Sequence, residues 1–234
     1  MFRYRWLVCL LCLMAPLANA DKSAIAQQWV NAIEQRNTTS LKRLLPVIDN
    51  INDQDAEGKT ALMVAAVTGD IELLQQLLRS GCEVDLTNHR GGTALMYAAA
   101  RNELPSAQSL VNRHANINLR AENGWTALIL ASAKGNHEMV KYLLHHGANP
   151  NIPDVYGWTA LMRAIQHGRP RVISHLVSSD RLEIDRINSK GQSALHIAAL
   201  ENDCGTIQLL IDRGANRLLK DFRQREIVIT AACQ

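Results

Sequence analysis

The chain has 234 residues, of which 47% are hydrophobic and 20% are charged, a composition that excludes intrinsic disorder and allows an ordered core. Aromatic residues make up only 4% while alanine and leucine are plentiful, so we expect closely packed helices and an all-α fold. The formal net charge of +3 is too small to indicate a nucleic-acid partner.

Residues 1–20 have the three parts of a secretory signal peptide. Two arginines precede an apolar run that ends at Leu17, and alanines suited to cleavage follow at positions 18 and 20. The run is shorter than the roughly 20 residues that a membrane helix needs. We therefore expect cleavage after Ala20, export, and no stable membrane insertion afterwards, with an uncleaved anchor as the alternative. Loss of the two arginines lowers the net charge from +3 to +1.

Residues 21–54 are predicted to form an N-terminal capping helical pair. The stretches "AIAQQWVNAIEQR" and "SLKRLLPVI" are both short and amphipathic, and "NTT" separates them. They look like a degenerate leading copy of the repeat that follows. The end copies of a solenoid are modified in this way because one side of them meets water.

Five copies of one motif occupy residues 55–220. They contain "GKTALMVAA", "GGTALMYAA", "GWTALILAS", "GWTALMRAI" and "GQSALHIAA", which begin at positions 58, 91, 124, 157 and 191, so neighbouring copies are 33 or 34 residues apart. We place the copies at residues 55–87, 88–120, 121–153, 154–187 and 188–220. A repeat of this length predicts a solenoid of stacked units.

Each copy is predicted to contain a turn and two helices. A hydroxyl residue before the apolar run can cap the first helix by accepting a hydrogen bond from a free backbone N–H group. These residues are Thr60, Thr93, Thr126, Thr159 and Ser193. Residues that tolerate a left-handed backbone end the first helix. They are Gly69, Asn102, Gly135, Gly168 and Asn202.

Two further features concern the end of the array. The fourth copy has an additional residue near Leu182 and Glu183, so we expect an irregular loop there. Residues 221–234 include "REIVITAAC", which aligns with a first helix and is predicted to be a C-terminal capping helix.

The repeat closely resembles the ankyrin repeat, whose period is 33 and whose signature begins Thr-Pro-Leu-His. Here alanine replaces the proline in each copy, and the histidine remains only as His196. The resemblance covers about three quarters of the chain. It implies an all-α ankyrin-repeat solenoid of stacked helix-turn-helix units joined by hairpin-like turns.

Three cysteines remain after the signal segment: Cys82, Cys204 and Cys233. A chain of this length buries its own core without disulfides, and three cysteines are too few to form a disulfide framework. At most one bridge is possible, and Cys204 with Cys233 is the pair to test. The alternative is separate, partly buried thiols.

The sequence contains no motif that indicates catalysis or cofactor binding. A phosphate-binding loop, a His-Glu-x-x-His motif and a Gly-x-Ser-x-Gly motif are all missing. His137 and His145 are about two helical turns apart, roughly 12 Å, so they cannot share one metal ion, and we interpret them and His146 as surface residues. We predict a protein that is not an enzyme and needs no cofactor or metal.

The resemblance implies a concave face, made of the turns and the outer ends of the first helices, that binds a partner. The residues of that face that we expect to contact the partner are Arg90, Arg101, Trp125, Lys134, Tyr156, Trp158 and His167. Trp125, Tyr156 and Trp158 are central, and tryptophan, tyrosine and arginine are enriched at binding hot spots. The alternative is that the tryptophans only cover the neighbouring turn.

We expect a monomeric adaptor or scaffold that binds another protein in a bacterial periplasm, because the chain resembles exported bacterial ankyrin-repeat proteins. Two alternatives lie within that class: an immunity protein or inhibitor that neutralises a secreted toxin, and a support factor for an exported stress-defence enzyme. An enzyme and a membrane-surface module are the competing classes. The near-neutral charge after removal of the signal argues against a membrane-surface module.

Overall fold

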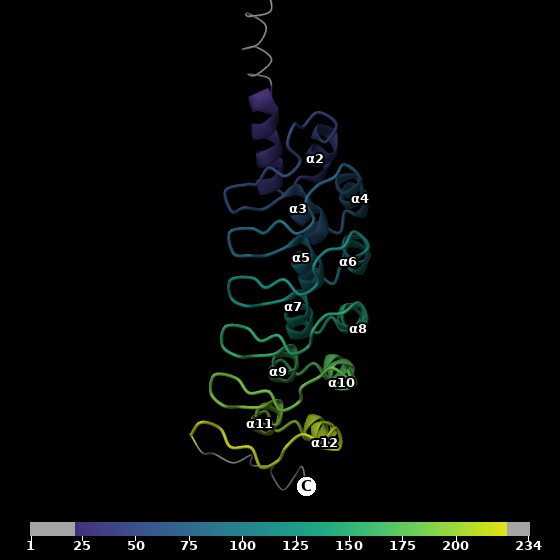
Figure 1. Cartoon of the computed structure of the whole chain (residues 1–234). Helices are drawn as coiled ribbons and strands as arrows, with labels where there is room; N and C mark the ends of the chain where they lie inside the picture. Colours follow the sequence, from purple (N-terminus) through teal and green to yellow (C-terminus); the bar gives the residue numbers. More distant parts are fainter. Residues whose placement is uncertain (1–21, 224–234) are drawn as a thin grey trace, which may run out of the picture.

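The computed structural model describes residues 22–223, and Figure 1 shows them as a stack of helical pairs. One column of the stack contains the first helix of each copy: α3 (Ala61–Thr68), α5 (Ala94–Arg101), α7 (Ala127–Lys134), α9 (Ala160–Gln166) and α11 (Ala194–Leu200). The second column contains α4 (Ile71–Arg79), α6 (Leu104–Val111), α8 (His137–His145), α10 (Pro170–Val177) and α12 (Cys204–Asp212). Within residues 22–223 there is no strand, only an isolated bridge between Ile187 and Ser193. The predicted all-α solenoid is confirmed.

The first-column helices form the interior of the stack. In α3, every residue from Ala61 to Ala66 is buried, and a helix that is apolar around its whole circumference belongs in an interior. It contacts α4 of its own copy and α5 of the next copy. Small residues such as Ala98, which has no exposed surface, let neighbouring helices approach closely.

Local hydrogen bonds begin these helices where the sequence predicts, and the C-termini of the helices are capped at the predicted residue in the first three copies and one residue earlier in the last two. The hydroxyl groups of Thr60, Thr93, Thr126, Thr159 and Ser193 each accept a hydrogen bond from the backbone N–H three residues later, at 3.2 to 3.5 Å. His196 also accepts a hydrogen bond at Nδ1 from the Ser193 N–H, at 3.2 Å. The five residues predicted to be left-handed have φ angles between 53° and 85°.

The second-column helices cover the interior with one face. In α4, Leu73, Leu74 and Leu77 have no exposed surface, while Glu72 and Gln75 are exposed. This pattern gives an apolar stripe that packs on α3 and α6. Prolines occupy the first turn of α6 and α10, where a missing N–H removes no helical hydrogen bond.

The turns before the first helices project to the left of the stack in Figure 1 and are joined into a ladder. The N–H of Glu122 donates to the carbonyl of Arg90 at 3.0 Å, and the N–H of Val155 donates to the carbonyl of Asn123 at 3.1 Å. Gly124, with φ +79°, lies so close to the next turn that a Cβ atom there would be 2.8 Å from the Asp154 Cα. Glycine is therefore required both by the backbone conformation and by the contact between copies.

At the N-terminal end, residues 22–34 are helical and α2 (Thr38–Leu44) follows. Trp29, Ile33 and Leu41 have no exposed surface, and α2 contacts α3 and α4. Two helices thus occupy the segment 21–54, and their role as a cap stays a prediction. The predicted signal peptide and, apart from residues 221–223, the predicted C-terminal capping helix lie outside the described residues. No helix within residues 22–223 has the length and apolar character needed to cross a bilayer.

The loop after α10 differs from its counterparts, as the additional residue predicts. Elsewhere a left-handed residue follows the second helix, for example Gly147 with φ 96° and His114 with φ 63°. Among the described residues between α10 and Asn188, none has a positive φ. Arg181 in this loop instead donates from Nη2 to the Leu144 carbonyl at 2.8 Å.

The two cysteines of the described region have different states. Cys204 is disulfide-bonded, which contradicts the expectation of separate thiols for this residue, and Cys233, its predicted partner, lies outside the described residues. Cys82 is a free thiol with 8% of its surface exposed. Burial raises the pKa of the Cys82 thiol to about 11, so this group stays protonated at neutral pH.

Candidate partner-binding face

The seven predicted partner-binding residues lie in two rows along the stack, and we call this surface the candidate face. The turn row contains Arg90, Trp125, Tyr156 and Trp158, and the helix-end row contains Arg101, Lys134 and His167. Five of the seven side chains are exposed, whereas Trp125 and Trp158 are half-buried. Tyr156 has 64% of its surface exposed.

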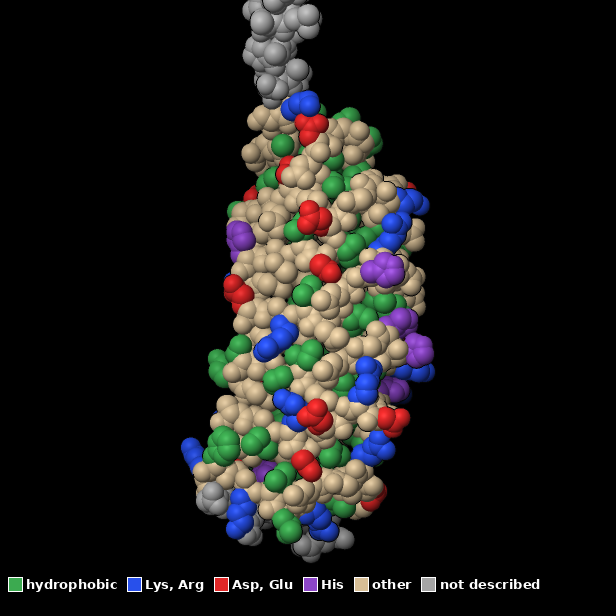
Figure 2. Space-filling view, viewed as in Figure 1, with side chains coloured by type: hydrophobic (Ala, Val, Ile, Leu, Met, Phe, Trp, Pro, Cys, Tyr) green, Lys and Arg blue, Asp and Glu red, His purple; other side chains and the backbone are tan. Residues whose placement is uncertain are grey.

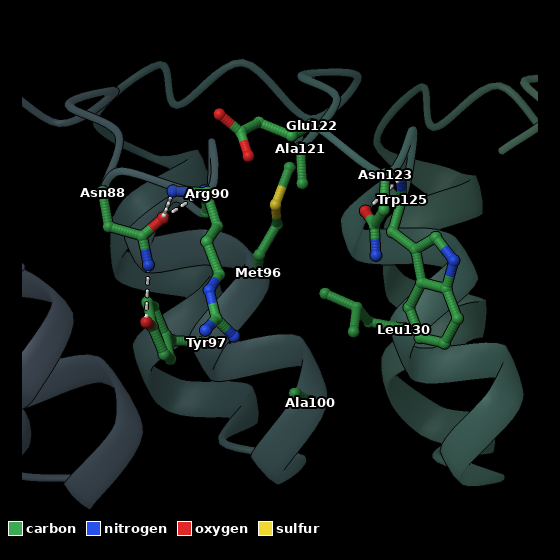
Figure 3. A pocket seen from close by; sticks show the side chains of 11 residues that line it. Asn88, Arg90, Met96, Tyr97, Ala100, Ala121, Glu122, Asn123, Trp125 and Leu130 are labelled. Carbon is green, nitrogen blue, oxygen red and sulfur yellow. Dashed lines mark hydrogen bonds between the residues drawn. The ribbon is translucent and has the colours of Figure 1, made fainter. Parts of the chain in front are cut away.

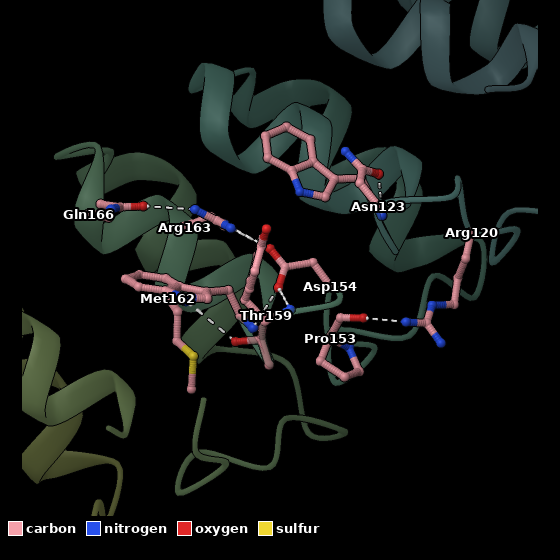
Figure 4. A network of polar contacts seen from close by, with 11 residues as sticks. Arg120, Asn123, Pro153, Asp154, Thr159, Met162, Arg163 and Gln166 are labelled. Atoms are coloured by element: carbon pink, nitrogen blue, oxygen red, sulfur yellow. Dashed lines mark hydrogen bonds and ion pairs between the residues drawn. The ribbon is translucent and has the colours of Figure 1, made fainter. Parts of the chain in front are cut away.

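Arg163, which the sequence reasoning missed, lies against both tryptophans. Its Cζ atom is 4.7 Å from the ring centroid of Trp158 and 5.5 Å from that of Trp125. Both distances are within the range of an attractive cation–π contact. Arg163 also donates from Nη1 to Gln166 at 3.1 Å, so its guanidinium is held from several sides (Figure 4).

Asp154 anchors this arrangement from inside the turn. Its carboxylate has no exposed surface and pairs with Nη2 of Arg163, while Oδ2 also accepts from Nε at 3.2 Å. Its Oδ1 atom accepts from the N–H groups of Tyr156 and Trp158, both at 2.9 Å. One buried carboxylate therefore shapes the turn that presents two of the predicted contact residues.

A sequence signal for this pair exists in the repeat itself. The position of Arg163 is filled in the other four copies by Val64, Tyr97, Leu130 and Ile197. A charged residue at an otherwise apolar position needs a partner, and an acid stands nine residues before it at Asp154. Comparison of the copies position by position could have found the pair.

The two tryptophans therefore have a structural role beside any role in binding. They are half-buried and lie on a guanidinium that is itself paired, which agrees with the alternative that they cover neighbouring residues. The structure does not bring Arg101 into this cluster. Arg90 and Trp125 instead both line a separate hollow.

That hollow has a volume of about 350 Å³ and lies between copies two and three. Met96, Tyr97 and Leu130 form apolar parts of its lining, and Arg90 and Trp125 lie at its sides (Figure 3). The Asn88 amide donates to the Tyr97 hydroxyl at 2.8 Å, which holds the tyrosine ring in place. The hollow is therefore a mostly apolar recess in a face with exposed polar and charged residues.

Comparison with known families decides what this stack is. The family model for ankyrin repeats in three copies matches residues 29–121, 63–154, 98–187 and 154–221, and these overlapping matches span most of the chain. The chain belongs to the ankyrin-repeat family. No curated protein is similar enough to the chain to count as a match.

Ankyrin repeats are typically protein-interaction modules without enzymatic activity, so membership of the family indicates a protein-binding role. The seven residues of the candidate face lie in the turns and at the ends of the first-column helices of this ankyrin-repeat chain.

Apart from His167 on the candidate face, His89 in a turn and the buried His196, the histidines lie along the second column of this ankyrin-repeat stack. Figure 2 shows them gathered mainly along the edge made by α6, α8 and α10. The rings of His137 and His175 are stacked with centroids 6.1 Å apart, and Nη1 of Arg171 is 3.3 Å from Nε2 of His137. Within residues 22–223, no group of three or more His, Cys, Asp or Glu side chains is arranged to hold a metal ion.

Proposed function

We propose that this ankyrin-repeat protein is exported to the periplasm and acts there as a monomeric, non-enzymatic adaptor or scaffold that engages another protein through the candidate face. The observation that carries the proposal is the helix-end row. Arg101, Lys134 and His167 are exposed at equivalent positions of three successive copies. Neighbouring packed helices are roughly 8–10 Å apart, so the row offers regularly spaced basic groups to an acidic surface.

The same position is uncharged in the first copy and acidic in the fifth. The equivalent residues there are Thr68 and Glu201, so the basic groups of the row are confined to the three middle copies. Complementary charge speeds encounter with a partner and selects among partners. We therefore propose a partner whose contact surface is acidic.

Two features support export. The first is the signal pattern of residues 1–20. The second is the disulfide at Cys204, because stable disulfides form mainly in oxidising compartments such as the periplasm. A fusion to alkaline phosphatase, which is active only outside the cytoplasm, tests the location. We expect activity that disappears when residues 1–20 are deleted, and activity retained after deletion would contradict export.

Binding is tested with a charge-reversal pair and a matched control. We expect Arg101→Glu with Lys134→Glu to abolish capture of the partner from a periplasmic extract by the tagged full-length protein. Arg113→Glu with Lys141→Glu makes the same change in net charge at exposed positions just after α6 and on α8, away from the candidate face, and should leave capture intact. Equal capture by both variants would contradict the proposed face.

The identity of the captured protein separates the alternatives. Recovery of a secreted toxin would replace the adaptor role by an immunity or inhibitor role. Recovery of an exported stress-defence enzyme would define the adaptor as its support factor.

A further inference from the structure

One position of the turn row differs between the copies in a way that leaves space. The residue just before the cap is Trp125 in the third copy and Trp158 in the fourth, but Gly92 in the second. Glycine has no side chain, so the second copy lacks the indole that its two successors have. The hollow of about 350 Å³ is lined by Gly92.

The repeat itself shows what would fill this hollow. Trp125 reaches into the next copy, where its ring lies 5.5 Å from Arg163. Shifted back by one copy, the position of Arg163 becomes that of Leu130. An indole at position 92 would therefore lie over Leu130, and it would contact Tyr97 in its own copy as Trp158 contacts Arg163. Leu130 and Tyr97 both line the hollow.

The walls of the hollow suit an aromatic group. Met96 and Leu130 supply aliphatic surface, and Tyr97 and Trp125 supply rings. Aromatic pairs and sulfur–aromatic contacts are both favourable. A volume of about 350 Å³ lies at the small end of the range of ligand sites, roughly 300–1,000 Å³, and matches one large side chain better than an extended ligand.

The charges around the hollow indicate which residues of the partner flank its aromatic side chain. Arg90 and Glu122 balance each other at the rim. The two helices that bound the hollow, α5 and α7, end in Arg101 and Lys134, which are both exposed. The surroundings are therefore basic on balance, and acidic residues beside the aromatic side chain would be attracted to them.

We propose that the hollow between copies two and three is an anchor pocket that binds one aromatic side chain of the partner, carried on an acidic segment of that protein. This inference rests on the proposed function and deepens it. The occupant takes the place that the chain's own tryptophan takes in the next two copies.

The third and fourth copies suggest a variant, Gly92→Trp, that would close the pocket. Gly92 does not have a positive φ, and its N–H donates to Asn88 Oδ1 at 2.7 Å, as the N–H of Trp158 donates to Asp154 Oδ1 at 2.9 Å. A tryptophan at this position can therefore adopt the backbone seen in the fourth copy. Gly92→Trp should fill the hollow, while Gly92→Ala adds only a Cβ atom, 3.2 Å from the Asn88 Oδ1, and leaves the hollow open.

The probe is an acetylated and amidated pentapeptide, Asp-Glu-Trp-Glu-Asp, titrated into the ¹⁵N-labelled chain that begins at residue 21, which contains the whole described fold. We expect saturable binding with shifts at the amides of Gly92, Tyr97 and Leu130. Binding should weaken at least about tenfold when alanine replaces the peptide tryptophan, when Lys-Arg-Trp-Arg-Lys is used instead, and in Gly92→Trp. Gly92→Ala should bind as the wild type does.

Three results would overturn the inference: no binding to the wild type, unchanged binding to a folded Gly92→Trp, or equal binding of N-acetyltryptophanamide, which would indicate a small aromatic ligand instead. Circular dichroism shows whether Gly92→Trp is folded, and if it is not, the alanine peptide and the amide map on the wild type decide. Loss of partner capture by Arg101→Glu with Lys134→Glu, together with no peptide binding, would leave the proposed function standing without the pocket. Peptide binding without any captured partner would support the pocket but leave the proposed function without support.

Discussion

The carboxylate of Asp154, which lies beneath the candidate face, is fully buried and therefore needs compensation for the loss of water. Removing a charge from water costs several kcal/mol unless a partner and hydrogen bonds compensate. Arg163 and two backbone N–H groups supply this compensation. The fifth copy makes the same turn with Asn188, whose Oδ1 accepts from two turn N–H groups, and with Ile197 at the arginine position.

This comparison predicts the behaviour of a double-mutant cycle. Arg163→Ile alone should destabilise the fold by about 3 kcal/mol because it leaves Asp154 buried without its cation. Adding Asp154→Asn should restore most of that loss, since the pair then matches the fifth copy. Urea unfolding followed by circular dichroism measures both changes. A neutral effect of Arg163→Ile would show that the ion pair does not contribute as described.

The cysteines give a second prediction at this scale. In the chain without residues 1–20, the predicted Cys204–Cys233 bridge leaves Cys82 as the one thiol. We expect slow reaction with Ellman's reagent at pH 8 in the native state, because the thiol is buried and its pKa is about 11. One thiol per chain should react after denaturation without reductant, and Cys82→Ala should remove it. Three reactive thiols would contradict the bridge.

At the residue scale, the sequence predicts what is local. The hydroxyl of Thr126 and the N–H of Ile129 are three residues apart, so a motif within one copy suffices to predict the cap. The contact between Trp125 and Arg163 joins residues of different copies. Its prediction requires the offset between neighbouring units, which the sequence of one copy does not contain.

At the scale of elements, α4 is a helix whose N-terminus is capped by a charged carboxylate, that of Asp70. Asp70 accepts from the Leu73 N–H at 3.0 Å and lies 2.9 Å from the Nζ atom of Lys42. Partial burial of the carboxylate opposes its ionisation, but the Leu73 N–H and the Lys42 and Thr38 side chains outweigh it, so the pKa of Asp70 is lowered. A carboxyl group with a lowered pKa in the folded state stabilises the fold above its unfolded pKa.

The element scale therefore gives a pH-dependent prediction. Asp70→Asn keeps a capping oxygen but removes the charge, and it should cost about 0.5–1 kcal/mol at pH 7. The difference from wild type should shrink as the pH falls below about 4, because Asp70 is then protonated first in the unfolded chain and, at lower pH, in the folded protein as well. Unfolding free energies measured from pH 7 to pH 2.5 test this. Glu72→Gln, at a side chain that is 67% exposed, should have a smaller effect, and a constant Asp70→Asn difference would contradict the assignment.

The first-column helices could be predicted almost to the residue because both of their ends have local signals, such as Thr93 and Asn102 around α5. For the loop after α10, the sequence predicts only that its conformation differs from that of the loops after the other second-column helices. Its conformation depends on Arg181, which reaches the end of α8 in the preceding copy, and the sequence does not reveal such a contact.

The whole molecule is held together by contacts between neighbouring units. α5 contacts α3, α6 and α7, and the strongest contacts of the other first-column helices follow the same pattern. In such a stack, stability is close to a sum of unit and interface terms, and the ends open most easily.

We therefore expect graded hydrogen exchange along the chain. The amides of α5, α7 and α9 should exchange most slowly, and those of residues 22–34 and α12 should exchange faster. Exchange measured by NMR at two pH values checks that the rates report equilibrium opening. Uniform protection from end to end would indicate one cooperative unit and contradict this expectation.

At this scale the repeat period predicts the architecture, because five units in register leave one way to bury their apolar sides. The hollow between copies two and three could not be predicted in the same way. It arises from a side chain that Gly92 lacks, and its depth depends on how closely α5 and α7 pack.

The additional residue of the fourth copy has a consequence for how this chain can vary. It lies in the loop after α10, and the Ser189 N–H still donates to the Tyr156 carbonyl at 2.9 Å. The spacing of the turns is thus unaffected by a change in chain length behind them. Insertions in the loops that follow the second helices would leave the order and pitch of the contact residues intact, so the length of a unit and the surface it presents can evolve separately.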